Sequence, residues 1–325
     1  MSGDLGAEVV VRAAAGSLQK YTHLDLILVG DERELGELVA SIVGTEPRLR
    51  IQHASEVVGM SEAPVEALRQ KKDSSMRVAI NLVKSGDADA CVSAGNTGAL
   101  MATSKFGLKM LPGIDRPAII TELPAIGGSL HMLDLGANTQ GSAEHLFQYA
   151  VMGSIVSSDI LGIERPKVAL LNIGAEDTKG HDTIKDASAL LQASTLNYVG
   201  FIEGSDLFAG KADVVVTDGF TGNVALKTME GTVGLAKHYL RRAFGRNWLT
   251  KLQALLAGPV LRKLAIEMDS RNYNGATLVG LNGIVIKSHG SADAYAFQHA
   301  IDTAIVEVRN QLPKQIGALL QEESA

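Results

Sequence analysis

Apolar and polar positions follow two different periods along the chain. Short runs rich in Val, Ile and Leu predict buried strands, and longer segments with apolar residues three or four apart predict helices. The predicted strands are residues 24–29, 49–53, 90–93, 118–123, 132–135, 168–173, 199–203, 214–217 and 284–287. The predicted helices are residues 32–43, 64–84, 97–108, 142–161, 183–193, 222–244 and 292–311.

This alternation of strands and helices indicates βαβ units with right-handed crossovers. We therefore predict an α/β fold with a largely parallel sheet sandwiched by helices. No repeat, low-complexity tract or obvious linker divides the chain. We expect one unit over residues 1–325, either a single large body or two intimately joined lobes.

Four predicted strands end in a loop of Gly, Asn, Ser, Thr or His that leads into a helical segment. These loops are residues 93–98, 134–139, 218–223 and 288–291. Because parallel strands end at one edge of a sheet, we expect the loops to line that edge, where ligands bind in α/β folds. Glycine allows close backbone approach, and helix N-termini offer free N–H groups to an anion. The loops together favour a phosphate-sized ligand, although helix capping alone also accounts for each one.

The exit of the strand at 168–173 is charged. Its loop contains Glu176 and Lys179. Lys179 could neutralise a phosphate or an oxyanion, and Glu176 could orient Lys179 or transfer a proton. A solvated charged loop is the alternative.

Two further exits carry polar side chains suited to catalysis. Asp218 and Asn223 flank the start of the helix at 222–244, where the Asn223 amide could donate to a carbonyl oxygen as negative charge develops. Capping of that helix is compatible with this role. His289 follows the strand at 284–287 and could act as an acid or base, although a structural hydrogen bond is the commoner role of a loop histidine. His131 and His181 are weaker candidates.

Composition excludes several classes of protein. The net charge of −6 argues against a nucleic-acid partner, which normally requires a basic surface. The single cysteine, Cys91, excludes an internal disulfide, and no His/Cys spacing predicts a metal site. No apolar stretch is long enough to span a membrane, and Met1 to Asp4 does not begin a signal peptide. We expect a cytosolic protein.

One segment departs from this acidic background. Residues 237–263 contain seven basic side chains and no acidic one, and Gly258-Pro259 divides the segment into two short helices with an apolar tip. Such a basic amphipathic hairpin, which we place at residues 237–268, favours contact with a membrane surface or an acidic partner. A core or dimer-interface hairpin is the alternative. The contact residues would be Trp248, Leu252, Leu255, Leu256, Val260, Leu261, Arg262 and Lys263.

Common nucleotide and hydrolase motifs are missing. The sequence has no GxxxxGK[ST] loop, no GxGxxG with a ribose-binding acid, no GxSxG and no HExxH. Phosphate binding is therefore predicted without nucleotide-driven chemistry.

Motifs along nearly the whole chain resemble one family, the bacterial phosphate acyltransferases (PlsX) of phospholipid synthesis. The matching stretches are SAGNTGALMA (93–102), RPAIITELP (116–124), LDLGAN with SAEHL (133–146), LLNIGAEDTKG (170–180), GFIEGSDLF (200–208), ADVVVTDGFTGNVALKTMEG (212–231) and GLNGIVIKSHGSADA (280–294). The start, Met1-Ser2-Gly3-Asp4, is similar to the family's amino-terminal MGGD turn.

The resemblance implies the reaction of acyl-ACP with inorganic phosphate to give acyl phosphate and ACP. It also implies a homodimer without metal, nucleotide or other cofactor, peripheral association with the inner face of the cell membrane, and hand-over of the product to a glycerol-3-phosphate acyltransferase. The implied fold is similar to that of phosphotransacetylases and isopropylmalate dehydrogenases. In family terms, the basic hairpin is similar to the membrane-contacting and acyl-delivery element.

Two departures from the family stand out. The family carries a first strand of roughly eight residues before MGGD, whereas this chain starts at the turn. Such a strand would be central to the sheet, so we expect a version that restores it to be more stable. Gln140-Gly141 stands where the family more often has Asp-Cys.

The resulting mechanism is direct attack by phosphate on the thioester carbonyl, without an acylated side chain. Lys179 would neutralise charge, Asn223 would hydrogen-bond the carbonyl oxygen, and Asp218, Glu176 or His289 would govern proton transfer. The alternatives are a dehydrogenase of the isopropylmalate type, for which metal-binding aspartates are missing, and a non-enzymatic lipid or ACP adaptor. The expected phosphate ligands are Ser93, Gly95, Asn96, Thr97, Gly98 and Asn138.

Overall fold

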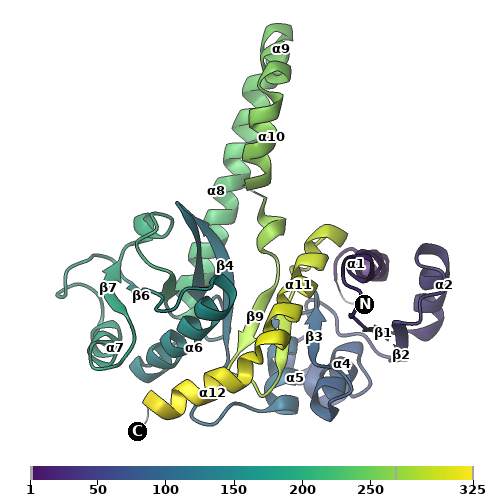
Figure 1. The fold of residues 1–325 in the computed structure, drawn as a ribbon, viewed down its shortest axis with the longest axis horizontal. Helices are drawn as coiled ribbons and strands as arrows, with labels where there is room; N and C mark the ends of the chain where they lie inside the picture. Colours follow the sequence, from purple (N-terminus) through teal and green to yellow (C-terminus); the bar gives the residue numbers. More distant parts are fainter. Residues whose placement is uncertain (1–2, 268, 324–325) are drawn as a thin grey trace.

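The computed structural model describes residues 3–267 and 269–323. It contains an eight-stranded sheet of order β3-β10-β9-β4-β5-β8-β6-β7 and a separate two-stranded sheet, β1-β2 (Figure 1). The strands are β1 (Leu26–Gly30), β2 (Leu49–His53), β3 (Ala90–Ser93), β4 (Ala118–Ala125), β5 (Gly128–Leu133), β6 (Val168–Leu171), β7 (Tyr198–Ile202), β8 (Val214–Val216), β9 (Ala276–Val279) and β10 (Ile284–Lys287).

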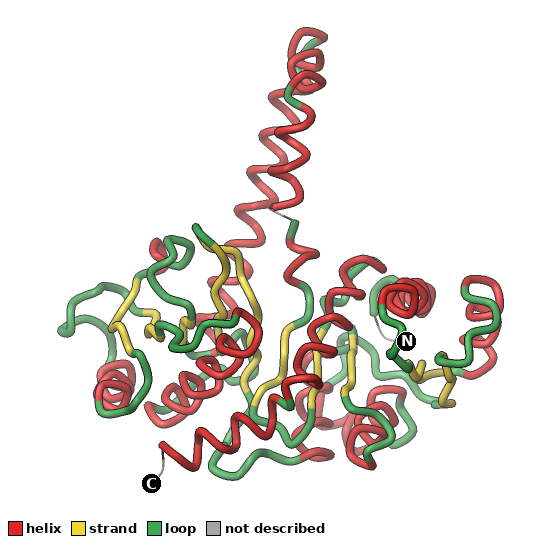
Figure 2. Tube along the Cα trace, viewed as in Figure 1, coloured by secondary structure: helices red, strands yellow, loops and turns green. Residues whose placement is uncertain are grey.

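Helices cover both faces of the large sheet (Figure 2). The helices are α1 (Gly6–Lys20), α2 (Glu32–Ile42), α3 (Pro64–Gln70), α4 (Ser75–Ser85), α5 (Thr97–Leu108), α6 (Ala143–Leu161), α7 (Asp182–Gln192), α8 (Gly219–Gly245), α9 (Trp248–Leu256), α10 (Gly258–Glu267), α11 (Ala294–Asn310) and α12 (Leu312–Glu323), with short 3-10 turns at η1 (Gly204–Asp206) and η2 (Ser270–Tyr273). Apolar side chains of α6, α7, α11 and α12 pack on one face, and those of α3, α4, α5 and α8 pack on the other. The predicted α/β sandwich is confirmed.

The large sheet consists of two parallel parts that run in opposite directions. β3 and β10 are parallel, as are β5, β8, β6 and β7, but β9 and β4 form antiparallel pairs between the two parts. The expectation that all polar strand exits share one edge is therefore wrong. Each apolar run predicts a strand but carries no information about its direction, and three successive antiparallel pairs, β10–β9, β9–β4 and β4–β5, reverse the direction between the two parts.

The strands of the two parts nevertheless have their carboxyl ends near the same row of paired residues across the sheet. Ile120 in β4 lies opposite Thr277 in β9, which lies opposite Ile286 near the end of β10. The chain leaves β5 beside the same part of β4, because the backbone N–H of Ile119 donates to the Asp134 carboxylate at 3.0 Å. Three strand spacings separate β5 from β10, which is about 14 Å. The exits of the two parts thus face a common region across β4 and β9.

A helical hairpin projects far beyond the sheet (Figure 1). The 27-residue helix α8 packs its first turns on the sheet through Ala225, Leu226 and Met229, and its remainder forms the hairpin with α9 and α10. As predicted, the chain turns at Gly258-Pro259, where α10 begins. Residue 268, the predicted end of the hairpin, lies outside the described residues. No described helix is long and apolar enough to cross a membrane.

A cavity of about 600 Å³ separates the small sheet from the large one. Leu26 and Leu28 of β1 and Ala90 and Val92 of β3 line it, together with side chains of α1, α4 and α11. In the described part of the chain, neither β1 nor β3 pairs with a strand on its cavity side. Two strand edges therefore face one another without a partner.

Sequence patterns missed or merged several elements. Helices α1 and α12 were not predicted, and residues 64–84 form two helices where one was expected. The Ser74 side chain accepts a hydrogen bond from the Arg77 N–H and so caps a new helix. The apolar pattern continues across this break, which explains the merger.

Candidate functional site

The exit of β5 is organised around a buried carboxylate. The side chain of Asp134 accepts hydrogen bonds from the backbone N–H groups of Ile119, Gly136, Ala137 and Asn138, at 2.7–3.2 Å. Burial raises the pKa of Asp134, and these hydrogen bonds act in the opposite direction. Sequence reasoning gave Asp134 no role, although a carboxylate directly after an apolar run was the available signal.

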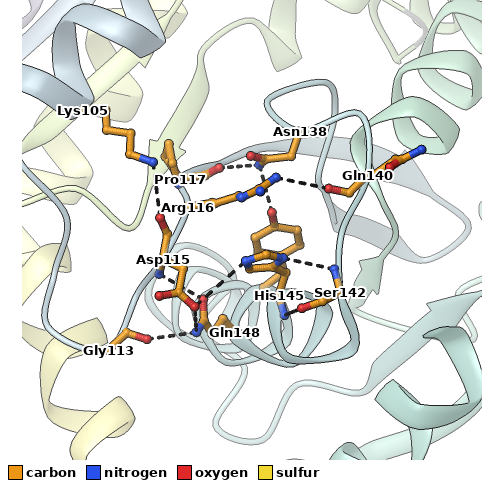
Figure 3. Close-up of polar contacts among 11 residues, drawn as sticks. Lys105, Gly113, Asp115, Arg116, Pro117, Asn138, Gln140, Ser142, His145 and Gln148 are labelled. Carbon is orange, nitrogen blue, oxygen red and sulfur yellow. Dashed lines mark hydrogen bonds and ion pairs between the residues drawn. The ribbon is translucent and has the colours of Figure 1, made fainter.

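Asn138 lies in the same loop, and its side-chain NH2 group donates to other residues of the protein. Its side-chain amide donates to the Pro117 carbonyl at 2.7 Å (Figure 3). It also donates to the Asp134 carboxylate and the Tyr149 hydroxyl, at 3.0 and 2.9 Å. Its backbone carbonyl accepts from the N–H of Gly219. Asn138 was predicted to bind phosphate; in the structure its side-chain donors hold the loop together.

The end of the loop between β5 and α6 lies beside the segment that precedes β4 (Figure 3). The ring Nδ1 of His145 accepts from the N–H of Ser142, so its Nε2 carries the proton and lies 4.0 Å from Asp115 (Figure 3). Arg116 donates to the Gln140 carbonyl at 3.5 Å. Gln140 makes this contact through its backbone carbonyl, so the contact does not depend on its side chain.

Helix α8 starts against this same loop. Asp218 caps the helix, because its carboxylate accepts from the Thr221 N–H and hydroxyl at 2.9 and 2.8 Å. A Cβ added to Gly222 would lie 1.9 Å from the Asp134 carbonyl oxygen, so only glycine allows this approach. Asn223 is exposed on the first turn, and its side chain lies beside Gly136. No residue in the described part of the chain hydrogen-bonds its amide, which leaves that donor available to a ligand.

The charged loop that follows β6 belongs to the same part of the sheet. β6 pairs with β8, so its exit lies beside the start of α8. Glu176 and Lys179 are both exposed, and the Lys179 N–H donates to the Glu176 carbonyl at 3.0 Å. The Asn172 amide donates to the Lys179 carbonyl and so shapes the loop. The Lys179 ammonium thus extends from an ordered turn at the same edge as Asn223.

The predicted phosphate loop lies at the exits of β3 and β10. The Ser93 hydroxyl accepts from the Gly95 N–H at 3.2 Å, and the Ser93 carbonyl accepts from the Ser288 N–H at 2.9 Å. Asn96 is buried; its amide donates to three carbonyls of residues 59–62, and its oxygen caps α5. Asn96 is therefore committed to structure and Gly95 is buried, whereas Ser93 is half-buried at the exit.

Thr97 and Gly98 form the first turn of α5. A Cβ on Gly98 would lie 2.7 Å from Pro64, so close packing of α3 requires a small residue there. Gly98 therefore has a packing role in addition to the predicted role in phosphate binding.

The exit of β10 adds a lysine that sequence reasoning overlooked. Lys287 is largely buried, and burial lowers its pKa to about 8. His289 donates its backbone N–H to Asn274, and its ring contacts the Ser291 hydroxyl at 2.9 Å. Burial, and then the positive charge of Lys227 on α8, lowers the pKa of His289. The ring is therefore neutral at pH 7, and its Nδ1 also accepts from the Ser291 N–H at 3.3 Å.

The candidate residues thus form two groups. Lys179, Asn223 and Asp218 lie at the exits of β6 and β8, and Ser93 and His289 lie at those of β3 and β10. Helix α8 is close to both groups, because it carries Asn223 and because the charge of its Lys227 acts on His289. No cluster of three or more His, Cys, Asp or Glu side chains among residues 3–267 and 269–323 is arranged to hold a metal.

Comparison with solved structures shows the same fold in acyl-transferring enzymes. A phosphotransacetylase from Streptococcus pyogenes superposes with a TM-score of 0.64 at 19% identity, covering 94% of this chain and 92% of that one. A branched-chain phosphotransacylase from Enterococcus faecalis gives a TM-score of 0.60 at 15% identity, with coverage of 94% and 97%. The predicted similarity to the phosphotransacetylase fold is confirmed.

Sequence comparison gives closer relatives. The family model described as "Fatty acid synthesis protein" matches residues 1–315. Phosphate acyltransferases of Nitrosococcus oceani and Alkalilimnicola ehrlichii are 57% and 56% identical over 324 and 322 residues, which is 99% of this chain and 95% and 94% of theirs. These relatives show that the protein is an acyltransferase whose reaction involves phosphate. The chain belongs to the phosphate acyltransferase family.

Proposed function

We propose that the protein forms acyl phosphate from acyl-ACP and inorganic phosphate, the early step of phospholipid synthesis that the sequence motifs imply. A phosphate oxygen attacks the thioester carbonyl carbon, a C–O bond forms, the C–S bond breaks, and the ACP thiolate leaves and takes a proton. The observation that supports this best is the unbonded Asn223 amide beside the glycine loop of β5, on a chain of the phosphate acyltransferase family.

Each step uses a group with a defined position. The Asn223 amide donates to the carbonyl oxygen as it becomes negative, which is where a fixed donor lowers the barrier. Lys179, from the neighbouring exit, offsets charge on the phosphate and the oxyanion. His289, neutral at pH 7, can receive a proton, whereas both carboxylate oxygens of Asp218 are engaged by Thr221.

Release of free ACP thiol from palmitoyl-ACP tests the proposal. We expect release to depend on inorganic phosphate in the unchanged protein. Lys179→Ala and Asn223→Ala should each lose most turnover while their melting temperatures stay near that of the parent, because both side chains are exposed. Phosphate-independent release, or near-normal rates in both variants, would overturn the assignment.

The hairpin supports a second part of the proposal, which is peripheral contact with an anionic membrane surface. Trp248, Leu255, Leu256 and Val260 keep 73–76% of their surface exposed at the tip, beside exposed Arg262 and Lys263. Apolar side chains at the end of a basic projection suit insertion between anionic headgroups. We propose further that the protein is a homodimer and passes its product to a glycerol-3-phosphate acyltransferase.

Vesicle flotation separates this surface role from a structural one. We expect the double variant Leu255→Gln/Leu256→Gln to lose binding to phosphatidylglycerol vesicles, since each leucine contributes about 1.5–3 kcal/mol when buried in an apolar medium. Ile126, which is 79% exposed in the β4–β5 turn, provides the matched control Ile126→Gln. Equal binding by the two variants would show that the tip does not enter the membrane.

A further inference from the structure

Lys287 and Ser93 lie side by side and face the same way. They are register partners in the parallel pair β3–β10. Two residues earlier, Cys91 and Val285 are also partners, and both are buried in the core beneath α4, α5 and α8. Because side chains alternate across a strand, those of Ser93 and Lys287 project from this same face, at its exit.

The ammonium of Lys287 has no anionic partner of its own. Its Nζ donates to the Ser288 carbonyl, and no carboxylate in the described part of the chain forms an ion pair with it. Asp4 is the carboxylate near enough to raise its pKa, but burial dominates and lowers the pKa to about 8. A cation that is largely buried and unpaired gains from any anion that reaches it.

Helix α8 brings a second lysine to the same place. The charge of Lys227 acts on both Lys287 and His289, although Lys227 itself pairs with Glu230 at 2.8 Å. Lys227 follows Asn223 by four residues, so the two lie one above the other on the same helix face. One turn of α8 therefore separates the lysine from the amide proposed to hold the thioester carbonyl.

We infer that Lys287 and Lys227 hold the inorganic phosphate substrate at the exits of β3 and β10, with the Ser93 hydroxyl as a neutral donor. This inference rests on the proposed function and adds two binding residues to it. The hydroxyl of Ser93 already accepts from Gly95, so its own proton is free to donate to a phosphate oxygen. Charge-assisted hydrogen bonds from two lysines fit a dianion of this size.

The inference also gives the two groups of the site separate tasks. Phosphate would bind at the β3–β10 exits, and the thioester carbonyl would bind beside Asn223 at the β5–β8 exits. The strands β5 and β10 are about 14 Å apart, but Lys227 follows Asn223 by a single turn of α8, about 6 Å, and its charge acts on Lys287. The two lysines would therefore hold the phosphate next to the carbonyl that it attacks. Lys179 then remains for the oxyanion at the second group.

Kinetics in phosphate test the two lysines. We expect Lys287→Met to raise the KM for phosphate about tenfold or more, as expected for the loss of a charge-assisted hydrogen bond, with the KM for palmitoyl-ACP within about twofold of the parent. Lys227→Met should change the KM for phosphate in the same direction, and Lys287→Arg should recover part of the loss. Lys84→Met, on the exposed side of α4, is the matched control.

Chemical labelling tests binding without turnover. The unchanged protein is treated with trinitrobenzenesulfonate at pH 8, with inorganic phosphate or with sodium chloride at the same ionic strength, and Lys287 is located by peptide mapping. We expect phosphate to protect Lys287 and chloride not to protect it. The same measurement decides the matter if Lys287→Met fails to fold.

The outcomes separate this inference from the proposed function. Phosphate-dependent thiol release with an unchanged KM for phosphate in Lys287→Met, and no protection of Lys287, would overturn the inference alone. Without any thiol release the proposed function fails, and the labelling result then decides whether Lys287 binds phosphate.

Discussion

Glu307 is a buried acid whose replacement should change how stability depends on pH. It lies on α11 with 1% of its surface exposed, and the Thr277 hydroxyl of β9 donates to one of its oxygens. The other oxygen has no hydrogen-bond partner among the described residues. Burial raises its pKa to about 8, and the nearby charge of Asp159 acts in the same direction.

The sign and size of the effect follow from linkage. An acid whose pKa is raised on folding is protonated in the native state and ionised in the unfolded chain at pH 7. It therefore reduces the free energy of unfolding as pH rises from about 4.5 to about 8. At pH 7 the reduction amounts to about 3 kcal/mol, since each unit of pKa difference corresponds to about 1.4 kcal/mol. Below pH 4.5 the penalty is absent.

Urea unfolding at several pH values between 5 and 8 measures this. Glu307→Gln cannot ionise, so its stability should fall less steeply with pH than that of the parent, even if its buried amide lowers stability at every pH. Glu164→Gln, at an exposed position, should follow the parent curve. Parallel curves for the parent and Glu307→Gln would refute the reasoning.

Three further changes test local packing. Gly222→Ala should destabilise the protein by more than 2 kcal/mol in thermal unfolding, because its Cβ would meet the Asp134 carbonyl, whereas Gly231→Ala on the same helix has open space and should be neutral or stabilising by about 0.5–1 kcal/mol. Asn96→Asp keeps the helix cap but loses donors to the 59–62 carbonyls, so a loss of about 1–3 kcal/mol is expected, and an unchanged melting temperature would contradict the structural role. An apolar strand of about eight residues fused ahead of residue 1 should raise the melting temperature by pairing in the cavity between β1 and β3, whose facing edges have no partner strand among the described residues; no increase would contradict that use of the cavity.

Local signals in the sequence predicted the elements and their exits well. Asn96 caps α5 at the predicted helix start, whereas α8 begins three residues before the predicted residue 222, with Asp218 as its cap. Such capping depends on residues within one turn of each other, so a short stretch of sequence contains it. The protruding hairpin was predicted for a similar reason, since its one-sided charge and its Gly258-Pro259 break are both local.

The sequence patterns did not predict how distant segments pair or which side chains they bury. The apolar run of β4 reads the same in a parallel or an antiparallel sheet, so the reversal that divides the exits into two groups was not visible. Burial was equally hidden: Lys287 ends a strand, as many surface lysines do, yet it is largely buried beside Ser93 of β3. Asn138, in turn, resembled a ligand until the buried Asp134 showed what its amide binds.

The length of α8 has a geometric consequence for the substrate. At Gly222 the helix packs closely against the Asp134 carbonyl. From Asn223 to Gly245 it is about 33 Å long, at 1.5 Å per residue. If the tip of the hairpin contacts a membrane as proposed, Asn223 would lie about 33 Å from the headgroups, roughly the thickness of the hydrocarbon core of a bilayer. The proposed acyl product would then have to travel along exposed apolar side chains of α8, such as Leu235 and Tyr239, to reach the lipid.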